Sequence, residues 1–139
     1  VDGYEKFQDE RPQAKEEMKN FIRDTAAYAR IVKGDRDFGI FAQNAPELLE
    51  DPAYAKILTG MGKEELYFFD TDDRTSEEDR AWDEALLDKL RDKGKLVLTV
   101  DYCHHEKNIE EAYRRSRKKG YIPYCTDVEL DRLTQHDID

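Results

Sequence analysis

The stretch Leu96-Val97-Leu98-Thr99-Val100 decides the fold class. Its residues are apolar or β-branched without interruption, and Gly94 and Asp101 bound it. A continuous run of this kind is typical of a parallel strand that is covered on both faces. We therefore expect a buried strand here, joined to its neighbours in the sheet through helices.

Helical and strand-like patterns alternate on both sides of this stretch. The spacing predicts helices over about 12–33, from 44 onward, from 75 through 90, over about 107–119, and a short closing helix over 128–133. Strand-like runs cover 38–42 and 121–124, and a further strand lies either at 59–64 or at 66–69. Glycines punctuate the units, since each of Gly34, Gly60, Gly94 and Gly120 follows a helical pattern and precedes a strand-like run.

Helix–strand alternation in every unit predicts a parallel sheet with crossover helices. The expected fold class is α/β: residues 1–139 form a single domain of about four parallel strands and five helices, one half of a (β/α)₈ TIM barrel. A small open α/β sheet is the alternative. A half-barrel alone leaves two unpaired sheet edges and an exposed inner face. We therefore expect the chain to form a homodimer or to pair with another half-barrel.

Composition excludes several classes of function. The chain carries a net charge of −10, which repels phosphate backbones, so nucleic-acid binding is not expected. No segment approaches the ~18 consecutive apolar residues of a membrane span, and no signal peptide is visible. Although 40% of the residues are charged, the aromatic residues lie in periodic apolar segments, which argues against disorder.

Candidate functional side chains follow the expected strands, where parallel α/β barrels gather their active-site groups. They are Asn44 after the first strand, Glu64 and Glu65 in the second unit, Asp101 and Tyr102 after the third, Cys125 and Asp127 after the fourth, and Asp2 and Tyr4 ahead of all of them. Carboxylates from different strand ends can converge on one cavity, as glycoside hydrolysis requires. With 33 acidic residues in the chain, position alone singles out none of them.

Five segments together resemble one enzyme family. They are Val1-Asp2-Gly3-Tyr4-Glu5, the run from Phe41 to Leu49, Glu64-Glu65-Leu66-Tyr67-Phe68, Val97-Leu98-Thr99-Val100-Asp101-Tyr102, and Gly120-Tyr121-Ile122-Pro123-Tyr124 with Leu130 and Leu133 beyond. In order and spacing they resemble the endo-α-1,4-polygalactosaminidase family (glycoside hydrolase family 114) and its relatives, once labelled cysteinyl-tRNA synthetase-related. The resemblance covers nearly the whole chain.

The resemblance implies a TIM barrel that cleaves galactosamine-containing polysaccharide with a pair of acids, without a cofactor or metal, outside the cell or in the periplasm. Glu64 matches the general acid/base. Asp2, Tyr4, Asn44, Asp101 and Tyr102 would bind the carbohydrate ligand. The second catalytic carboxylate precedes the position of Asp2 and is not in this sequence. The chain is therefore expected to be a glycosidase that is incomplete by itself, with two alternatives: a non-catalytic carbohydrate-binding or assembly module, and a fragment of a longer enzyme.

Two further patterns have competing interpretations. Cys103-His104-His105 and Cys125 could hold zinc or form a disulfide, but they are more typical of buried thiols and loop residues. The basic run from Arg114 to Lys119 falls at a helix C-terminus, where the helix dipole favours cations, and phosphate binding is its less expected role.

Overall fold

Four strands form one parallel sheet in the order β1-β2-β5-β6 in the computed structural model, which describes residues 1–138. The strands are β1 (Phe41–Gln43), β2 (Gly60–Glu64), β5 (Leu96–Tyr102) and β6 (Ile122–Thr126). Gly60 pairs with Leu96 and Glu64 with Val100, so the carboxyl ends of β2 and β5 lie side by side. The predicted fold class is confirmed: four parallel strands in one sheet, matching half of a TIM barrel.

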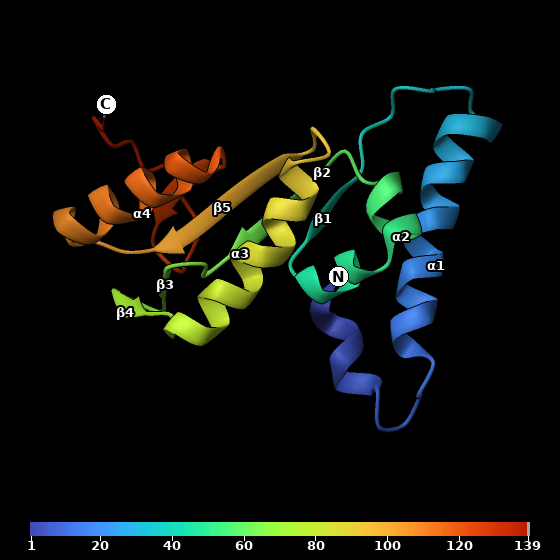
Figure 1. Cartoon of the computed structure of the whole chain (residues 1–139), viewed down its shortest axis with the longest axis horizontal. Coiled ribbons are helices and arrows are strands. Elements are labelled where there is room, and N and C mark those ends of the chain that lie inside the picture. Colours follow the sequence, from blue (N-terminus) through green and yellow to red (C-terminus); the bar gives the residue numbers. More distant parts are fainter. Residues whose placement is uncertain (139) are drawn as a thin grey trace.

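Helices connect these strands (Figure 1). The chain begins with a 3₁₀ helix, η1 (Asp2–Phe7), and then α1 (Ala14–Ala27), which continues as the π-helical turn η2 (Tyr28–Val32). The 3₁₀ helix η3 (Pro46–Glu50) and α2 (Pro52–Ile57) join β1 to β2, α3 (Glu77–Arg91) precedes β5, and α4 (Glu106–Lys119) precedes β6. A small antiparallel hairpin, β3 (Phe68–Phe69) with β4 (Asp73–Arg74), follows β2. No helix among residues 1–138 has the length and apolar character needed to cross a membrane.

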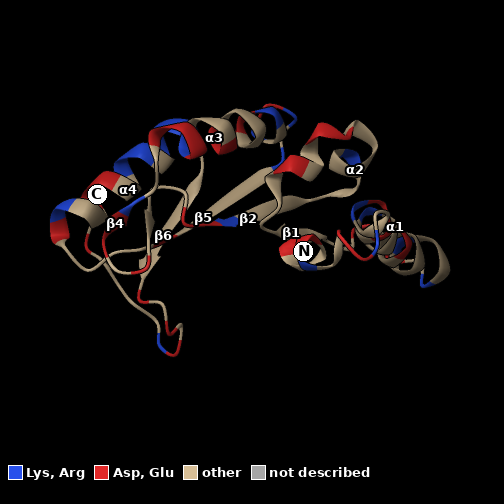
Figure 2. Cartoon of the chain, turned by 90° about the horizontal axis from the view of Figure 1, so that it is seen from below, with Lys and Arg blue, Asp and Glu red and all other residues tan. Residues whose placement is uncertain are grey.

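The helices α2, α3 and α4 cover one face of the sheet (Figure 2). Successive side chains of a strand point to opposite faces, so Val97 and Thr99 of β5 point toward the helices and are buried. Met61 on β2 and Leu87 on α3 belong to the same buried set. The hydrophobic core therefore lies between the sheet and this helix layer.

Among residues 1–138, no helix lies over the opposite face of the sheet (Figure 2). Three large apolar residues on this side, Phe41, Leu96 and Ile122, are 46–51% exposed. They alternate with the buried positions of their strands, which identifies this as the inner face of the half-barrel. The burial of both faces expected from the 96–100 run therefore holds for the helix side only.

Several local predictions are settled by the described residues. The strand of the third unit is Gly60–Glu64, whereas Phe68–Phe69 belongs to the hairpin. Ser76 is the N-cap of α3, and its hydroxyl accepts a hydrogen bond from the Asp79 amide at 3.1 Å. The predicted closing helix over 128–133 is wrong: these residues form turns and coil.

Candidate active site

Glu64 lies at the carboxyl end of β2, where groups from both neighbouring strands contact it. The Tyr102 hydroxyl, at the end of β5, donates a hydrogen bond of 2.5 Å to Glu64 Oε1. The Asn44 amide, just after β1, donates to Glu64 Oε2 at 2.7 Å. Asn44 Oδ1 in turn accepts the Glu64 backbone N–H at 2.9 Å. Three adjacent strand ends therefore fix one carboxylate.

Asn44 is placed by an unusual backbone. It and Ala45 both have positive φ angles, 58° and 53°, and its backbone N–H donates to the Gly62 carbonyl at 2.8 Å. Left-handed geometry is tolerated by asparagine but costs free energy at alanine, and such strain clusters at functional positions. Ala45 occupies the N-cap of η3, and the Asn44 side chain turns to Glu64.

Asp2 joins this group from the start of the chain. Its Oδ2 lies 3.4 Å from Asn44 Nδ2, and its side chain is exposed. The Val1 amino group donates to the Gln43 carbonyl at 2.7 Å, which places η1 against the end of β1. Of the predicted site residues, Asp2, Asn44, Glu64 and Tyr102 thus form one cluster, which we call the Glu64 cluster.

The cluster stabilises Glu64 as a carboxylate. The hydrogen bond from Tyr102 holds the pKa of Glu64 below its ordinary value, and the contacts with Asn44 and Gln43 add to this against the opposing effect of burial. For Tyr102 itself, burial and then the bond to Glu64 raise the pKa of the phenol. Glu64 is therefore the anion and Tyr102 the neutral donor over the ordinary pH range.

Tyr4 and Asp101, predicted to bind substrate, do not reach this cluster. Tyr4 is buried, and its hydroxyl donates to the Glu47 carboxylate. Asp101 is fully buried on the helix side of β5, because the strand alternation that points Tyr102 inward turns Asp101 the opposite way.

Asp101 instead anchors the segment after β2. Its Oδ1 accepts the backbone N–H groups of Tyr67 at 2.6 Å and Phe68 at 3.0 Å. Within residues 1–138 its Oδ2 is buried and has no partner, and burial raises the pKa of Asp101 to about 6 despite the two amide bonds. Asp101 therefore fixes the backbone of the segment that follows β2.

Asp72, in the turn of the β3–β4 hairpin, fixes the far end of the same segment. Its carboxylate accepts the backbone N–H groups of His104 and His105 at 3.0 and 3.1 Å and the Asn108 side-chain amide at 2.9 Å. The hairpin β3–β4 is thereby tied to His104 and His105, which immediately precede α4, and to Asn108 in the first turn of that helix.

Two neighbours of Glu64 were not predicted as site residues. The Gln43 side chain lies over Gly62, where an added Cβ would come within 2.2 Å of Gln43 Oε1. Lys63 points the other way, pairing with Asp83 at 3.2 Å and donating to the Glu64 carbonyl at 2.6 Å. Strand alternation could have identified Gln43 as a site residue: Gln43 lies two residues after Phe41 and therefore faces the same inner side of the sheet.

Cys103 and Cys125 are both buried free thiols. Among residues 1–138 no group of three or more His, Cys, Asp or Glu side chains is arranged to hold a metal ion. The contact with Cys103, and then burial, raise the pKa of Cys125. The structure therefore matches the interpretation of this pair as ordinary buried thiols.

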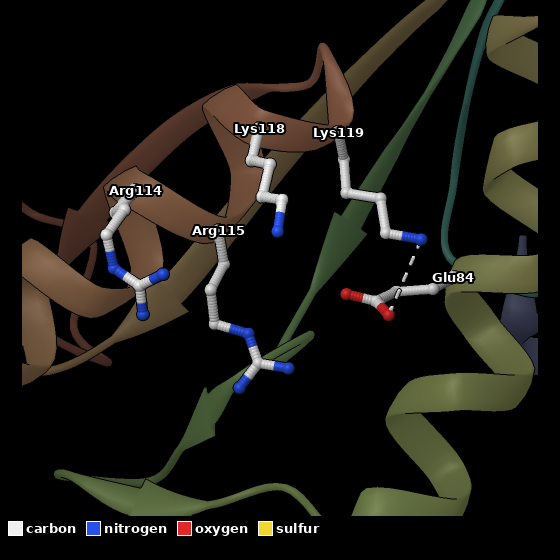
Figure 3. Close-up of a pocket in the computed structure, with 5 residues that line it drawn as sticks. All are labelled: Glu84, Arg114, Arg115, Lys118 and Lys119. Carbon is white, nitrogen blue, oxygen red and sulfur yellow. Dashed lines mark ion pairs between the residues drawn. The ribbon is translucent and has the colours of Figure 1, made fainter.

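The basic run lines a separate cavity of about 350 Å³ between α3 and α4 (Figure 3). Lys119 lies 2.7 Å from Asp88 and 3.6 Å from Glu84, and Arg115 lies 3.2 Å from Glu111. These acidic side chains neutralise much of its positive charge. The cavity lies between helices, away from the strand ends that carry Glu64, so it takes no part in the candidate active site.

Two solved structures that resemble this chain are of one glycoside hydrolase domain. The glycoside hydrolase domain of PelA from Pseudomonas aeruginosa superimposes with a TM-score of 0.70 and 20% identity over 100% of this chain and 56% of that one. A variant of the same domain gives a TM-score of 0.65 over 94% of this chain and 51% of that one. The fold is half of a TIM barrel, as in that glycoside hydrolase domain. The half-barrel covers the whole of residues 1–138 that the structure describes.

Sequence relatives of the half-barrel are longer proteins. An uncharacterised protein from Deinococcus radiodurans is 35% identical over 136 residues, which are 96% of this chain and 42% of that protein. An uncharacterised protein from Methanocaldococcus jannaschii is 37% identical over 131 residues, 84% of this chain and 37% of that protein. The chain thus spans about two fifths of the curated relatives it matches. No family model matches it.

Proposed function

We propose that this half-barrel contributes Glu64 to a glycosidase active site. The observation that carries the proposal is the placement of Glu64 at the carboxyl end of β2, held by donors from both neighbouring strands. In TIM barrels the active site lies at this end of the strands. A carboxylate fixed there from two sides is preorganised to act on a bound substrate.

The direction of its pKa shift supports one of the two catalytic roles for Glu64. A glycosidase needs one protonated carboxyl group to act on the leaving oxygen, and one carboxylate to attack the sugar or to activate water. A general acid needs a raised pKa, whereas the pKa of Glu64 is lowered by Tyr102. Of the general acid/base functions that the resemblance gives to Glu64, the structure therefore favours the carboxylate one. The acid would come from a group outside this chain.

The remaining members of the cluster would bind the sugar. Asn44 and Tyr102 use their polar groups to orient Glu64. Asp2 is exposed next to Asn44, so the hydroxyl or amino groups of a sugar would contact Asp2 first. Asp101 and Tyr4 would support the site from within the fold rather than touch substrate.

We propose an amino sugar polymer, galactosamine-containing polysaccharide, as the substrate class. The sequence resemblance supports this choice, and so does charge, because a chain with net charge −10 attracts a cationic polymer. Asp2 adds an exposed carboxylate next to Asn44 of the cluster.

The test is a release assay for reducing ends on α-1,4-linked galactosamine polymer, run with this chain combined with the barrel half that supplies the acid. Binding of short oligomers is followed by NMR. Glu64→Gln is the test variant, and Glu65→Gln is its matched control, the same change of charge at the adjacent exposed residue. Turnover that Glu64→Gln abolishes and Glu65→Gln retains supports the glycosidase. Oligomer binding at the cluster without turnover supports a non-catalytic carbohydrate-binding module. Absence of both contradicts a carbohydrate function.

A further inference from the structure

We propose that the cavity between α3 and α4 binds a small phosphorylated molecule through its phosphate group. The cavity has a volume of about 350 Å³, and its wall consists of four cations and one carboxylate: Arg114, Arg115, Lys118, Lys119 and Glu84 (Figure 3). In a chain of net charge −10, this is a local excess of positive charge. All five residues belong to this chain and lie apart from Glu64, so the proposal does not rest on the proposed function.

The helix dipole alone does not explain where these cations lie on α4. They form two i, i+4 pairs, Arg114 with Lys118 and Arg115 with Lys119, which place four like charges on one side of the helix. Like charges at this spacing repel each other and weaken a helix. The dipole favours cations only in the last turn, which includes Lys118 and Lys119 but not the two arginines. An anion bound among the four side chains would relieve the repulsion.

Two of the four cations have no carboxylate of their own. Arg114 and Lys118 are exposed, and among residues 1–138 neither side chain has an acidic group within ion-pair distance. They lie one turn apart on the same helix and on the same side as Arg115 (Figure 3). Their N–H groups are therefore available to a ligand in the cavity.

Arg115 is held in place at the wall of the cavity. Its Cζ lies 4.7 Å from the centre of the Tyr67 ring, and its Nη1 lies 3.2 Å from Glu111. Glu111 also accepts hydrogen bonds from Arg74 at 3.0 and 2.8 Å, so one carboxylate is shared by two guanidinium groups. A guanidinium has five N–H donors in a planar fork that matches the oxygens of a phosphate. Arg115 is thus a fixed cation with donors left for a ligand.

Lys119 brings the fourth cation, and its acidic partners are also shared. Its Nζ lies 2.7 Å from Asp88 and 3.6 Å from Glu84, while Asp88 also pairs with Arg91 at 2.7 Å. Glu84 is the one acidic residue in the cavity wall, and it also accepts a hydrogen bond of 3.2 Å from the Tyr67 hydroxyl. Glu84 and Lys119 point toward each other (Figure 3). A bound phosphate would therefore lie nearer the other three cations, away from the Glu84 charge.

The lining determines the chemistry of the ligand. Donors from several separate side chains suit a group with three or more acceptor oxygens, which favours phosphate over carboxylate. The volume falls in the range of small-molecule sites and leaves room for an organic part beside the phosphate. Glu84 can accept hydroxyl groups of that part. The net charge of −10 repels a long polyanion such as RNA, so a small molecule is favoured.

The experiment follows the backbone amide signals of the nitrogen-15-labelled chain by NMR. Inorganic phosphate, glucose 1-phosphate and adenosine diphosphate are added in separate titrations, and glucose is the control without a phosphate group. We expect shifts at residues 114–119 and around Glu84 with the phosphate compounds only. We also expect at least one of the two esters to bind about tenfold or more tightly than inorganic phosphate, and the tighter one identifies the organic part as sugar or nucleotide.

Variants locate the contact. Arg114→Gln and Lys118→Gln should each weaken binding of that ester about tenfold, the effect of losing one charge-assisted hydrogen bond. Both side chains are exposed, so the variants should fold. Lys107→Gln is the matched control, the same change of charge at an exposed position at the other end of α4, and should leave the affinity unchanged. Glu84→Gln should tighten binding, because it removes a repelling charge and keeps an acceptor for the Tyr67 hydroxyl.

Three results would overturn the proposal. The first is the absence of shifts at residues 114–119 with every phosphate compound. The second is equal weakening by Lys107→Gln and Lys118→Gln, which would reduce the interaction to general attraction by charge. The third is a pair of esters that bind no more tightly than inorganic phosphate, which would mean an adventitious ion only. Polysaccharide hydrolysis is not a readout here, so failure of the glycosidase proposal would leave this one standing.

Discussion

The Tyr102 hydroxyl donates a 2.5 Å hydrogen bond to Glu64 and so joins the ends of β5 and β2 across the mouth of the half-barrel. This bond is the largest influence on the pKa of Glu64, which it lowers. A neutral tyrosine at this position keeps the neighbouring carboxylate charged without supplying a counter-charge.

Tyr102→Phe should therefore raise the pKa of Glu64. The measurement is a carbon-13 NMR titration of the Glu64 carboxyl group. Tyr4→Phe is the control, since the Tyr4 hydroxyl donates to Glu47, and it should leave the Glu64 titration unchanged. An unchanged pKa in Tyr102→Phe would contradict the role assigned to this bond.

Asp101 should make stability depend on pH in the direction opposite to an ordinary ion-paired carboxylate. Burial raises its pKa from 3.8 to about 6 in the folded chain. The folded state therefore binds the proton more tightly than the unfolded state. The stabilisation is complete below pH 4 and is lost as the pH rises through 6, by about 3 kcal/mol at most.

Asp101→Asn removes this titration while keeping an oxygen acceptor for the Tyr67 and Phe68 amides. Urea unfolding at half-unit steps from pH 4 to 7 should show a flatter profile for the variant than for the parent chain. Parallel profiles for the two proteins would show that Asp101 does not carry the dependence.

Two glycines of β2 should differ in their tolerance of alanine. A Cβ on Gly60 would come within 2.6 Å of the Leu96 carbonyl, which is backbone of the adjacent strand and cannot move away. A Cβ on Gly62 would meet the flexible end of Gln43 instead. Gly60→Ala should therefore cost about 1–3 kcal/mol of unfolding free energy, and Gly62→Ala less, by urea denaturation. Equal losses would mean that Gln43 is as rigidly held as the backbone.

The Cys103 and Cys125 thiols should be inert in the native chain. Both are buried, and the contact between them raises the pKa of Cys125, so little reactive thiolate forms at neutral pH. A chromogenic disulfide reagent should label neither thiol at pH 8 until urea unfolds the protein, after which both react. Rapid labelling of the folded chain would contradict this burial.

Sequence patterns predicted the repeated helix–strand units because the signals that begin and end a helix lie within a few residues of it. Gly34, Gly94 and Gly120 have the positive φ angles expected at helix ends, and Ser76 caps α3, a position that serine favours. The choice between 59–64 and 66–69 for a strand depended on which segment β5 accepts as a neighbour, which periodicity does not encode.

The candidate site was predicted in part, for a related reason. Asn44, Glu64 and Tyr102 follow strand ends, and parallel strands bring those ends together. Asp101 is adjacent to Tyr102 in sequence, but strand alternation sends it to the opposite face, where it bonds to the Tyr67 amide. The inward face could be assigned only once the helix layer was known.

Asp72 couples two segments that are far apart in the sequence. The first amides of a helix have no partner within the helix, and here the hairpin carboxylate supplies one for His104 and His105 at the start of α4. Neither segment can open while the other stays closed. Hydrogen exchange should therefore find the β3–β4 hairpin and the first turn of α4 as one cooperative unit, and a ligand that stabilises the hairpin would slow exchange in the helix as well.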